Sequence, residues 1–153
     1  MRSPDPLRRP AAARPRRGYT LMEVCVVLAV LAAVLAMGVP RWWRLEQRLA
    51  ARGAASLLTR ALLDARHEAA RQGRRVALRV DTARATVTVF AGTDTLARHD
   101  LHDTFGVTLE ASRDSLAYAP TGLGYGASNA RFLITRGPAV ETVSVSRVGR
   151  VRR

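Results

Sequence analysis

The sequence predicts an α+β fold in which one long N-terminal helix packs on a small antiparallel β-sheet domain. Three observations lead to this prediction. Residues 18–40 are almost entirely apolar, and Glu23 is their single charged side chain. Residues 41–73 place apolar side chains at helical spacing, and from Arg74 onward apolar and polar residues alternate as they do in strands. A chain of 153 residues has room for one such domain with an appendage.

Residues 1–18 have the composition of an unstructured basic leader. They contain six arginines against one acid, which is +5 of the formal net charge of +13. Four prolines among them interrupt any helix. Every cation of the chain is an arginine, and such an excess usually indicates nucleic acid or an anionic surface as partner. Residues 19–153 keep 19 arginines against 11 acids, or +8, so part of this signal depends on the leader.

Residues 19–40 are predicted to form a transmembrane helix. Residues 24–39 are sixteen consecutive residues without a polar side chain. A helix over residues 18–40 would span roughly 34 Å, enough for a hydrocarbon core of about 30 Å. No side of this helix is more apolar than another, so lipid or other helices must surround it. Cys25 lies within it and is interpreted as a small apolar side chain.

Three export signals compete for this region. A secretory signal would be cut after the apolar run, near Val34-Leu35-Ala36, and a twin-arginine signal would use Arg16-Arg17. The third option is a leader cut before the run, so that the helix is retained. Glu23 favours this option, because a carboxylate there costs about 2.5–3.5 kcal/mol unless it is paired. Cleavage after Gly18 would place a new amino terminus on Tyr19, one helical turn away from Glu23.

Residues 16–24, RRGYTLMEV, resemble the type IV prepilin motif. The shared features are a basic leader, a glycine, an aromatic residue, Thr-Leu, and a glutamate as the fifth residue of the mature chain. The resemblance implies cleavage after Gly18 by a prepilin peptidase, N-methylation of Tyr19, and a role for Glu23 in assembly. Tyr19 departs from the commoner phenylalanine. Pro40 resembles the proline that often closes the first apolar stretch of pilins.

Residues 41–73 are predicted to continue the helix as an amphipathic segment lying on the sheet. They contain no proline, and their only interior glycine is Gly53. Gln72-Gly73 is a typical C-terminal stop. Trp42 and Trp43 suit the headgroup interface, or alternatively pack on a neighbouring domain. Six apolar residues share one face: Ala54, Leu58, Ala61, Leu62, Ala65 and Ala69.

Residues 74–153 are predicted to form the sheet domain. Period-two alternation occurs in five short segments: 76–80, 86–90, 107–109, 132–135 and 143–146. Asp81-Thr82-Ala83-Arg84 is a plausible turn between the first two. Short strands in sequence with tight connections favour antiparallel pairing.

The sequence offers little catalytic chemistry. His99-Asp100-Leu101-His102-Asp103 contains metal-ligand residue types, but we interpret it as a polar loop or strand end. The glycine-rich residues 122–126 lack the Lys-Ser/Thr of a phosphate-binding loop. A single cysteine excludes an intrachain disulfide and a Cys-based zinc site. We find no case for an enzyme, a bound metal or a cofactor.

The last seven residues carry four arginines, a planar cation that suits phosphate oxygens. A solvated tail is the ordinary interpretation of such a run. However, the layout of residues 118–122, 132–134, 143–146 and 149–150 is similar to the GspH/FimT subgroup of pilin-like proteins. Some members are minor pseudopilins of type II secretion and others belong to type IV pilus systems. Certain members bind DNA in natural transformation through a Gly-Arg-any-Arg motif, which Gly149-Arg150-Val151-Arg152 matches.

Two functions from different classes follow from this resemblance. The first is a structural subunit that assembles with other pilin or pseudopilin subunits. Its helix would cross the inner membrane once, and its C-terminal domain would face the periplasm or become part of a filament. The second is a DNA-binding module on the same scaffold. Its contacts would come from the C-terminal cluster: Arg147, Gly149, Arg150, Arg152 and Arg153.

Overall fold

The computed structural model describes residues 18–126 and 129–153, so the leader before Gly18 lies outside the described residues. The chain divides into two compact units, and the boundary between them along the sequence falls between residues 38 and 39. The long helix α1 (Leu21–Gln72) begins in the first unit and ends in the second. The second unit also holds a short helix, α2 (Leu101–Phe105), and the strands β1 (Val76–Asp81), β2 (Thr86–Ala91), β3 (Asp94–Asp100), β4 (Thr108–Ala111), β5 (Ser115–Tyr118), β6 (Ala130–Arg136), β7 (Ala139–Val145) and β8 (Val151–Arg152).

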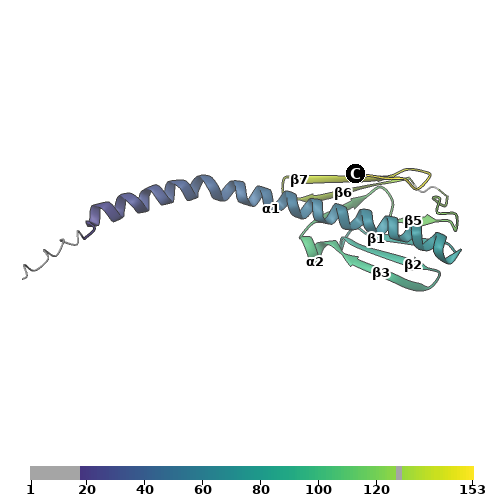
Figure 1. The fold of residues 1–153 in the computed structure, drawn as a ribbon. Coiled ribbons are helices and arrows are strands. Elements are labelled where there is room, and N and C mark those ends of the chain that lie inside the picture. Colours follow the sequence, from purple (N-terminus) through teal and green to yellow (C-terminus); the bar gives the residue numbers. More distant parts are fainter. Residues whose placement is uncertain (1–17, 127–128) are drawn as a thin grey trace, which may run out of the picture. The chain divides into compact units, whose positions relative to one another are not determined.

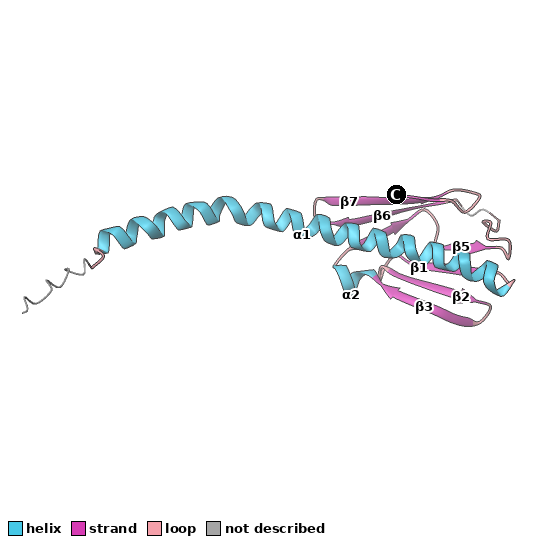
Figure 2. Cartoon of the chain, viewed as in Figure 1, coloured by secondary structure: helices cyan, strands magenta, loops and turns pink. Residues whose placement is uncertain are grey.

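The strands form two four-stranded sheets (Figures 1 and 2). The first sheet has the order β3-β2-β1-β5, and the second has the order β4-β6-β7-β8. All pairings within the two sheets are antiparallel. The predicted α+β fold, one long helix with an antiparallel sheet domain, is therefore confirmed. The described strands are, however, divided between two sheets rather than joined in one.

The second half of α1 buries the face that its helical spacing predicts. All six positions of that face are buried: Ala54, Leu58, Ala61, Leu62, Ala65 and Ala69. They share one apolar cluster with inward side chains of both sheets, among them Leu78 of β1 and Phe132 of β6. Each large apolar side chain buried in this cluster stabilises the fold by about 1.5–3 kcal/mol. The helix ends at Gln72, and Gly73 follows with a φ of 60°, the left-handed conformation of many helix ends.

Four elements were not predicted from the sequence: β3, α2, β5 and β8. The edge strand β3 is mostly exposed and shows no clear alternation, while β5 and β8 have only four and two residues, too few for a pattern to be recognised. The segment interpreted as a polar loop or strand end does end strand β3 at Asp100, but its last three residues begin helix α2. The Asp100 side chain caps that helix by accepting a hydrogen bond from the Asp103 amide at 2.9 Å, and Gly106 ends it in the left-handed conformation.

A cluster of contacts holds α2 and the second sheet to α1. A Cβ on Gly53 would lie 2.6 Å from Cε1 of Phe105, so this glycine permits the close approach of the two helices. Arg136 of β6 donates a hydrogen bond to the Phe105 carbonyl. Its Nη2 also lies 2.6 Å from Oε1 of Glu46 on α1. The interior glycine of the long helix thus has a packing role.

Candidate functional site

The start of α1 is set by a threonine cap. The Thr20 hydroxyl accepts a hydrogen bond from the Glu23 amide at 3.2 Å, and the Thr20 carbonyl accepts one from Val24. Ser or Thr followed three residues later by Glu is a capping-box pattern, so the start of this helix has a signal in the sequence. Glu23 therefore lies in the first turn of α1, where the helix dipole favours a negative charge.

The fold itself does not require a glycine at position 18. A Cβ placed on Gly18 would meet no atom of the described residues within 4 Å, and Gly18 is not among the glycines with a positive φ. Gly53 and Gly149, in contrast, stand where a Cβ would collide with a neighbour. If glycine is required at position 18, the requirement therefore comes from a protein that binds this segment and not from the packing of the described fold.

Tyr19, Glu23 and Val27 form a stripe: Glu23 and Val27 share one face of α1 because they are four residues apart, and Tyr19, two residues before the helix begins, lines the same hollow. Together with Val24 and Leu28 they line a shallow hollow of about 350 Å³. Among the described residues Glu23 has no ion-pair partner. The stripe thus presents one unpaired carboxylate within an apolar surface.

The rest of the apolar segment is equally uncovered. Helix α1 contains a stretch long and apolar enough to cross a membrane, and none of that stretch is buried. Leu28, Leu31 and Leu35 are each more than half exposed. Large apolar side chains in such a row require lipid or other helices around them. Trp42 and Trp43 are also largely exposed, at 73% and 60%.

The C-terminal arginines lie on and beside a tight hairpin between β7 and β8. The Ser146 carbonyl accepts a hydrogen bond from the Gly149 amide at 2.8 Å, and the Ser146 amide donates to the Arg150 carbonyl at 2.9 Å. The Ser146 hydroxyl accepts a further bond from the Arg150 amide at 3.1 Å. Gly149 has a φ of 79°, which a residue with a side chain adopts only with strain. The turn therefore accounts for glycine at the first position of the Gly-Arg-any-Arg motif.

Gly149 also packs closely against the glycine-rich loop. A Cβ at this position would lie 2.9 Å from Cε1 of Tyr118 and 3.2 Å from the amide nitrogen of Gly124. Tyr118 is fully buried, and its hydroxyl has no hydrogen-bond partner among the described residues. Burial raises the pKa of Tyr118 to about 12, although the charge of Arg66 acts in the opposite direction. The loop and the hairpin thus share one tightly packed contact.

The four arginines do not share one environment. Arg147, Arg150 and Arg152 are exposed, and none forms an ion pair with another described residue. Arg153 instead turns back onto the fold. Its Nη1 donates to the Ser56 hydroxyl at 2.8 Å, and its Nε lies 3.7 Å from Oε2 of Glu141. Three of the four guanidinium groups are therefore open to a ligand, and the fourth has partners within the protein.

The histidine and aspartate segment has a structural role. Asp100 caps α2, and Nδ1 of His102 lies 3.3 Å from the Val107 carbonyl oxygen. The hydrogen bond from the Asp103 amide is the main cause that lowers the pKa of Asp100. Among the described residues no group of three or more His, Cys, Asp or Glu side chains is arranged to hold a metal ion.

Comparisons with known proteins identify relatives of the chain. Residues 54–149 match the family model described as type II transport protein GspH. The pilin-like protein PilA1 of Thermus thermophilus is 31% identical over 156 residues, an alignment that covers 90% of this chain and 97% of PilA1.

Solved structures with a similar fold come from two filament systems. The type IV minor pilin FimU of Pseudomonas aeruginosa is 21% identical with a TM-score of 0.55, and the match covers 66% of this chain and 90% of FimU. The minor pseudopilin EpsH from the type II secretion system of Vibrio cholerae is 17% identical with a TM-score of 0.54, covering 67% of this chain and 94% of EpsH. At these identities the two matches establish a shared fold.

Proposed function

The chain belongs to the GspH family of type IV pilin-like proteins, and we propose that it acts as a minor subunit of a type II secretion pseudopilus or a type IV pilus. Its uncovered apolar helix fits a membrane-anchored subunit. In the proposed cycle a prepilin peptidase cleaves after Gly18, and Tyr19 becomes the methylated N-terminus. The helix then holds the subunit in the inner membrane with its sheet domain in the periplasm until assembly.

The observation that carries this proposal is the carboxylate of Glu23, which has no ion pair among the described residues and lies within an otherwise apolar, unburied stripe. A carboxylate surrounded by lipid is costly, whereas one paired with an ammonium group is tolerated. In a bundle of such helices, the N-terminal ammonium of an adjacent subunit can supply that pair. The ion pair would then set the axial register between subunits, while the flanking apolar side chains provide the packing.

Glu23→Ala tests this role. We expect the variant to be processed and inserted into the membrane normally, because alanine lowers the cost of burying the helix in lipid. Its share in sheared filaments, measured by immunoblot, should fall clearly below the wild-type share. Glu110→Ala is a matched control, because it removes an exposed carboxylate of β4 that has no ion pair among the described residues. Wild-type incorporation of Glu23→Ala would refute the assembly role.

A second candidate function is sequence-independent DNA binding by the C-terminal cluster. The specific support is that Arg147, Arg150 and Arg152 are exposed on and beside a hydrogen-bonded turn, and none of their guanidinium groups forms an ion pair among the described residues. Arginine donates two parallel hydrogen bonds to phosphate oxygens, and affinity from such contacts falls steeply with salt. A mobility shift with the full-length protein in neutral detergent should show weaker binding for Arg150→Gln/Arg152→Gln. Equal affinity of this variant and the wild type would exclude the site.

A further inference from the structure

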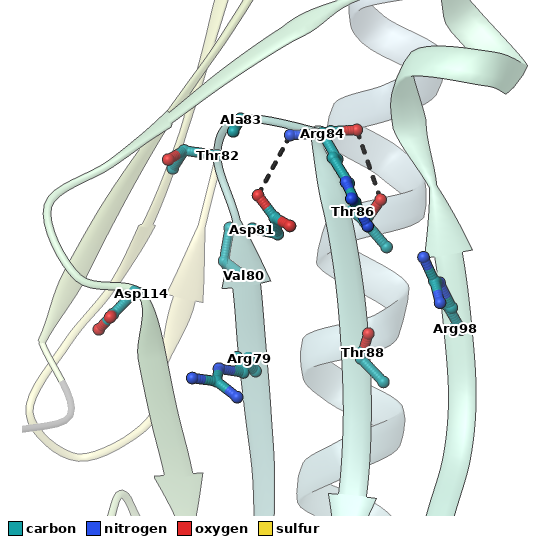
Figure 3. Close-up of a pocket in the computed structure, with 10 residues that line it drawn as sticks. All are labelled: Arg79, Val80, Asp81, Thr82, Ala83, Arg84, Thr86, Thr88, Arg98 and Asp114. Carbon is teal, nitrogen blue, oxygen red and sulfur yellow. Dashed lines mark hydrogen bonds between the residues drawn. The ribbon is translucent and has the colours of Figure 1, made fainter.

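A row of donor side chains crosses the first sheet on the face opposite α1. Arg79 of β1 pairs in register with Thr88 of β2, and Thr88 pairs with Arg98 of β3. Both arginines are exposed, and Thr88 is partly exposed. The strand residues that alternate with this row, such as Leu78 and Val89, belong to the core shared with α1. The row Arg79–Thr88–Arg98 therefore faces away from the helix, as Figure 3 shows.

This row borders a hollow of about 450 Å³ at the end of the β1–β2 hairpin. The hairpin turn supplies a third arginine, Arg84 (Figure 3). Two acids line the same hollow, Asp81 and Asp114. Asp81 serves the turn, since its Oδ1 accepts a hydrogen bond from the Arg84 amide at 3.2 Å. The hollow thus holds three arginines against two aspartates, one of which is engaged with the backbone.

The three arginines of this hollow are unneutralised within the part of the chain that the structure describes. None of Arg79, Arg84 and Arg98 forms an ion pair there. Five other arginines do form ion pairs with carboxylates: Arg52, Arg71, Arg74, Arg136 and Arg153. Guanidinium groups that form no ion pair on an open sheet face are available to an external anion.

A second hollow, of about 330 Å³, continues the basic surface along β1 and β5. It is lined by Arg75 and Arg113 together with Tyr125 and contains no acid. The Arg75 guanidinium lies 5.0 Å from the centroid of the Tyr125 ring, a cation–π distance, and the ring is 55% exposed. The two hollows are neighbours, because Ser115 of the second pairs in register with Arg79 of the first.

We propose that this outer face of the first sheet binds a nucleic-acid strand. Arg79 and Arg98 would hold phosphates on either side of the Thr88 hydroxyl, and Arg84 would extend the contact at the turn. Their strands are two apart, so the two arginine backbones lie about 10 Å from each other, within reach of adjacent phosphates along one strand. This site is distinct from the C-terminal cluster, which lies on the second sheet, and it goes beyond the proposed role in assembly.

The aromatic ring favours nucleic acid over an acidic polypeptide as the occupant. Arginine forks suit phosphates and carboxylates alike, so charge alone does not separate the two partners. Tyr125, more than half exposed in the neighbouring hollow, adds an aromatic surface against which a base can stack and which glutamate and aspartate side chains cannot use. Arginines and an aromatic ring on an open antiparallel sheet are the combination with which single strands are bound without sequence preference.

The test measures binding of a fluorescein-labelled oligothymidylate to the full-length protein in neutral detergent, by anisotropy, between about 50 and 200 mM salt. For Arg79→Gln/Arg98→Gln we expect roughly tenfold weaker binding at low salt, and a salt slope reduced by about 1.4, since each lost contact to a single strand removes about 0.7. Arg48→Gln/Arg60→Gln is the matched control, because it removes two exposed charges of α1 and should leave affinity within about twofold. Equal losses in both variants would mean diffuse attraction and overturn the proposal.

Two further arms separate this site from the alternatives. If Arg150→Gln/Arg152→Gln abolishes binding while the sheet variant, Arg79→Gln/Arg98→Gln, binds like the wild type, the C-terminal cluster alone is the site and the proposal fails. Unlabelled polyglutamate should compete much less well than unlabelled oligonucleotide; equal competition would assign the face to an acidic protein and overturn the proposal. Thermal unfolding confirms that each variant is folded. Filament incorporation of the sheet variant should stay normal, so failure of the assembly role would be seen separately, with Glu23→Ala.

Discussion

Replacing Gly149 by alanine tests whether the C-terminal hairpin depends on its close packing against the glycine-rich loop. Gly149 combines a φ of 79° with a Cβ position 2.9 Å from a ring carbon of Tyr118. The ring is fully buried and cannot swing into solvent. The backbone of Gly124, at 3.2 Å, limits movement on another side. An added methyl group therefore meets both conformational strain and a collision.

The two penalties have separate magnitudes. An alanine in the left-handed conformation costs about 1–2 kcal/mol. Forcing an extra carbon into a packed site costs about 1–3 kcal/mol more. Together they lower the free energy of unfolding by roughly 2–5 kcal/mol, a large part of the 5–15 kcal/mol typical of a domain. For a domain of about 100 residues, in which 1 kcal/mol shifts Tm by about 4–5 °C, this corresponds to a fall in Tm of roughly 8–25 °C.

Thermal unfolding of the full-length protein in neutral detergent, followed by circular dichroism, measures this loss. Gly73→Ala is the matched control, because Gly73 has a φ of 60° but no atom within 4 Å of its Cβ position. It should lose only the conformational part, about 1–2 kcal/mol. If the two variants unfold at the same temperature, the contact with Tyr118 contributes nothing and the reasoning is wrong. If Gly149→Ala loses more stability than Gly73→Ala, Gly149 is a structural residue. Substitutions of the arginines in the motif, and not of this glycine, are then the ones that test ligand binding.

Three further predictions address single groups. Tyr118→Phe should leave the free energy of unfolding unchanged or raise it by up to about 1 kcal/mol, because it removes a buried hydroxyl without a partner among the described residues; a clear loss in urea unfolding would reveal a missed hydrogen bond. The Arg71 side chain lowers the pKa of Glu68 from 4.5 to about 2, so their pair stabilises the fold above pH 4.5, and this stabilisation is lost as the pH falls toward 2. The Tm difference between wild type and Glu68→Gln should shrink over that range, and a constant difference would contradict the pairing. Gly18→Asp should block cleavage of the leader without affecting the fold, because no atom of the described residues lies within 4 Å of the Gly18 Cβ position; a mature-sized product in mass spectrometry would refute the leader assignment.

The long helix was predictable because its determinants are local. Good helix formers run from residue 41 without a proline, and the six residues predicted to face the sheet are all buried. Strands β1 and β2 were visible for the same reason, since alternation and the turn at Asp81–Arg84 are read from neighbouring residues. Strand β3 was missed because an edge strand exposes both faces and therefore shows no period of two.

The candidate sites also differ in whether neighbouring residues in the sequence are enough to predict them. Gly18, Tyr19 and Glu23 are recognised by spacing along one segment, which needs no tertiary structure. The row Arg79–Thr88–Arg98 depends on the register of three strands, and no periodicity in the sequence supplies that register. The contact of Gly149 with Tyr118 likewise joins two distant segments. Local motifs thus predicted the segment proposed for assembly, whereas the sheet face became visible only in three dimensions.

The arginines discussed above fall into two groups in the folded domain, those that hold the fold together and those that form no ion pair among the described residues. Arg52, Arg136 and Arg153 connect α1 with the second sheet through Glu141, Glu46 and Ser56, so their charge serves the fold. The arginines of the first-sheet face and of the hairpin have no such ion pairs among the described residues. None of these arginines belongs to the apolar stretch that carries the proposed assembly contact. Assembly and anion binding therefore rest on separate residues, so each should be lost without the other.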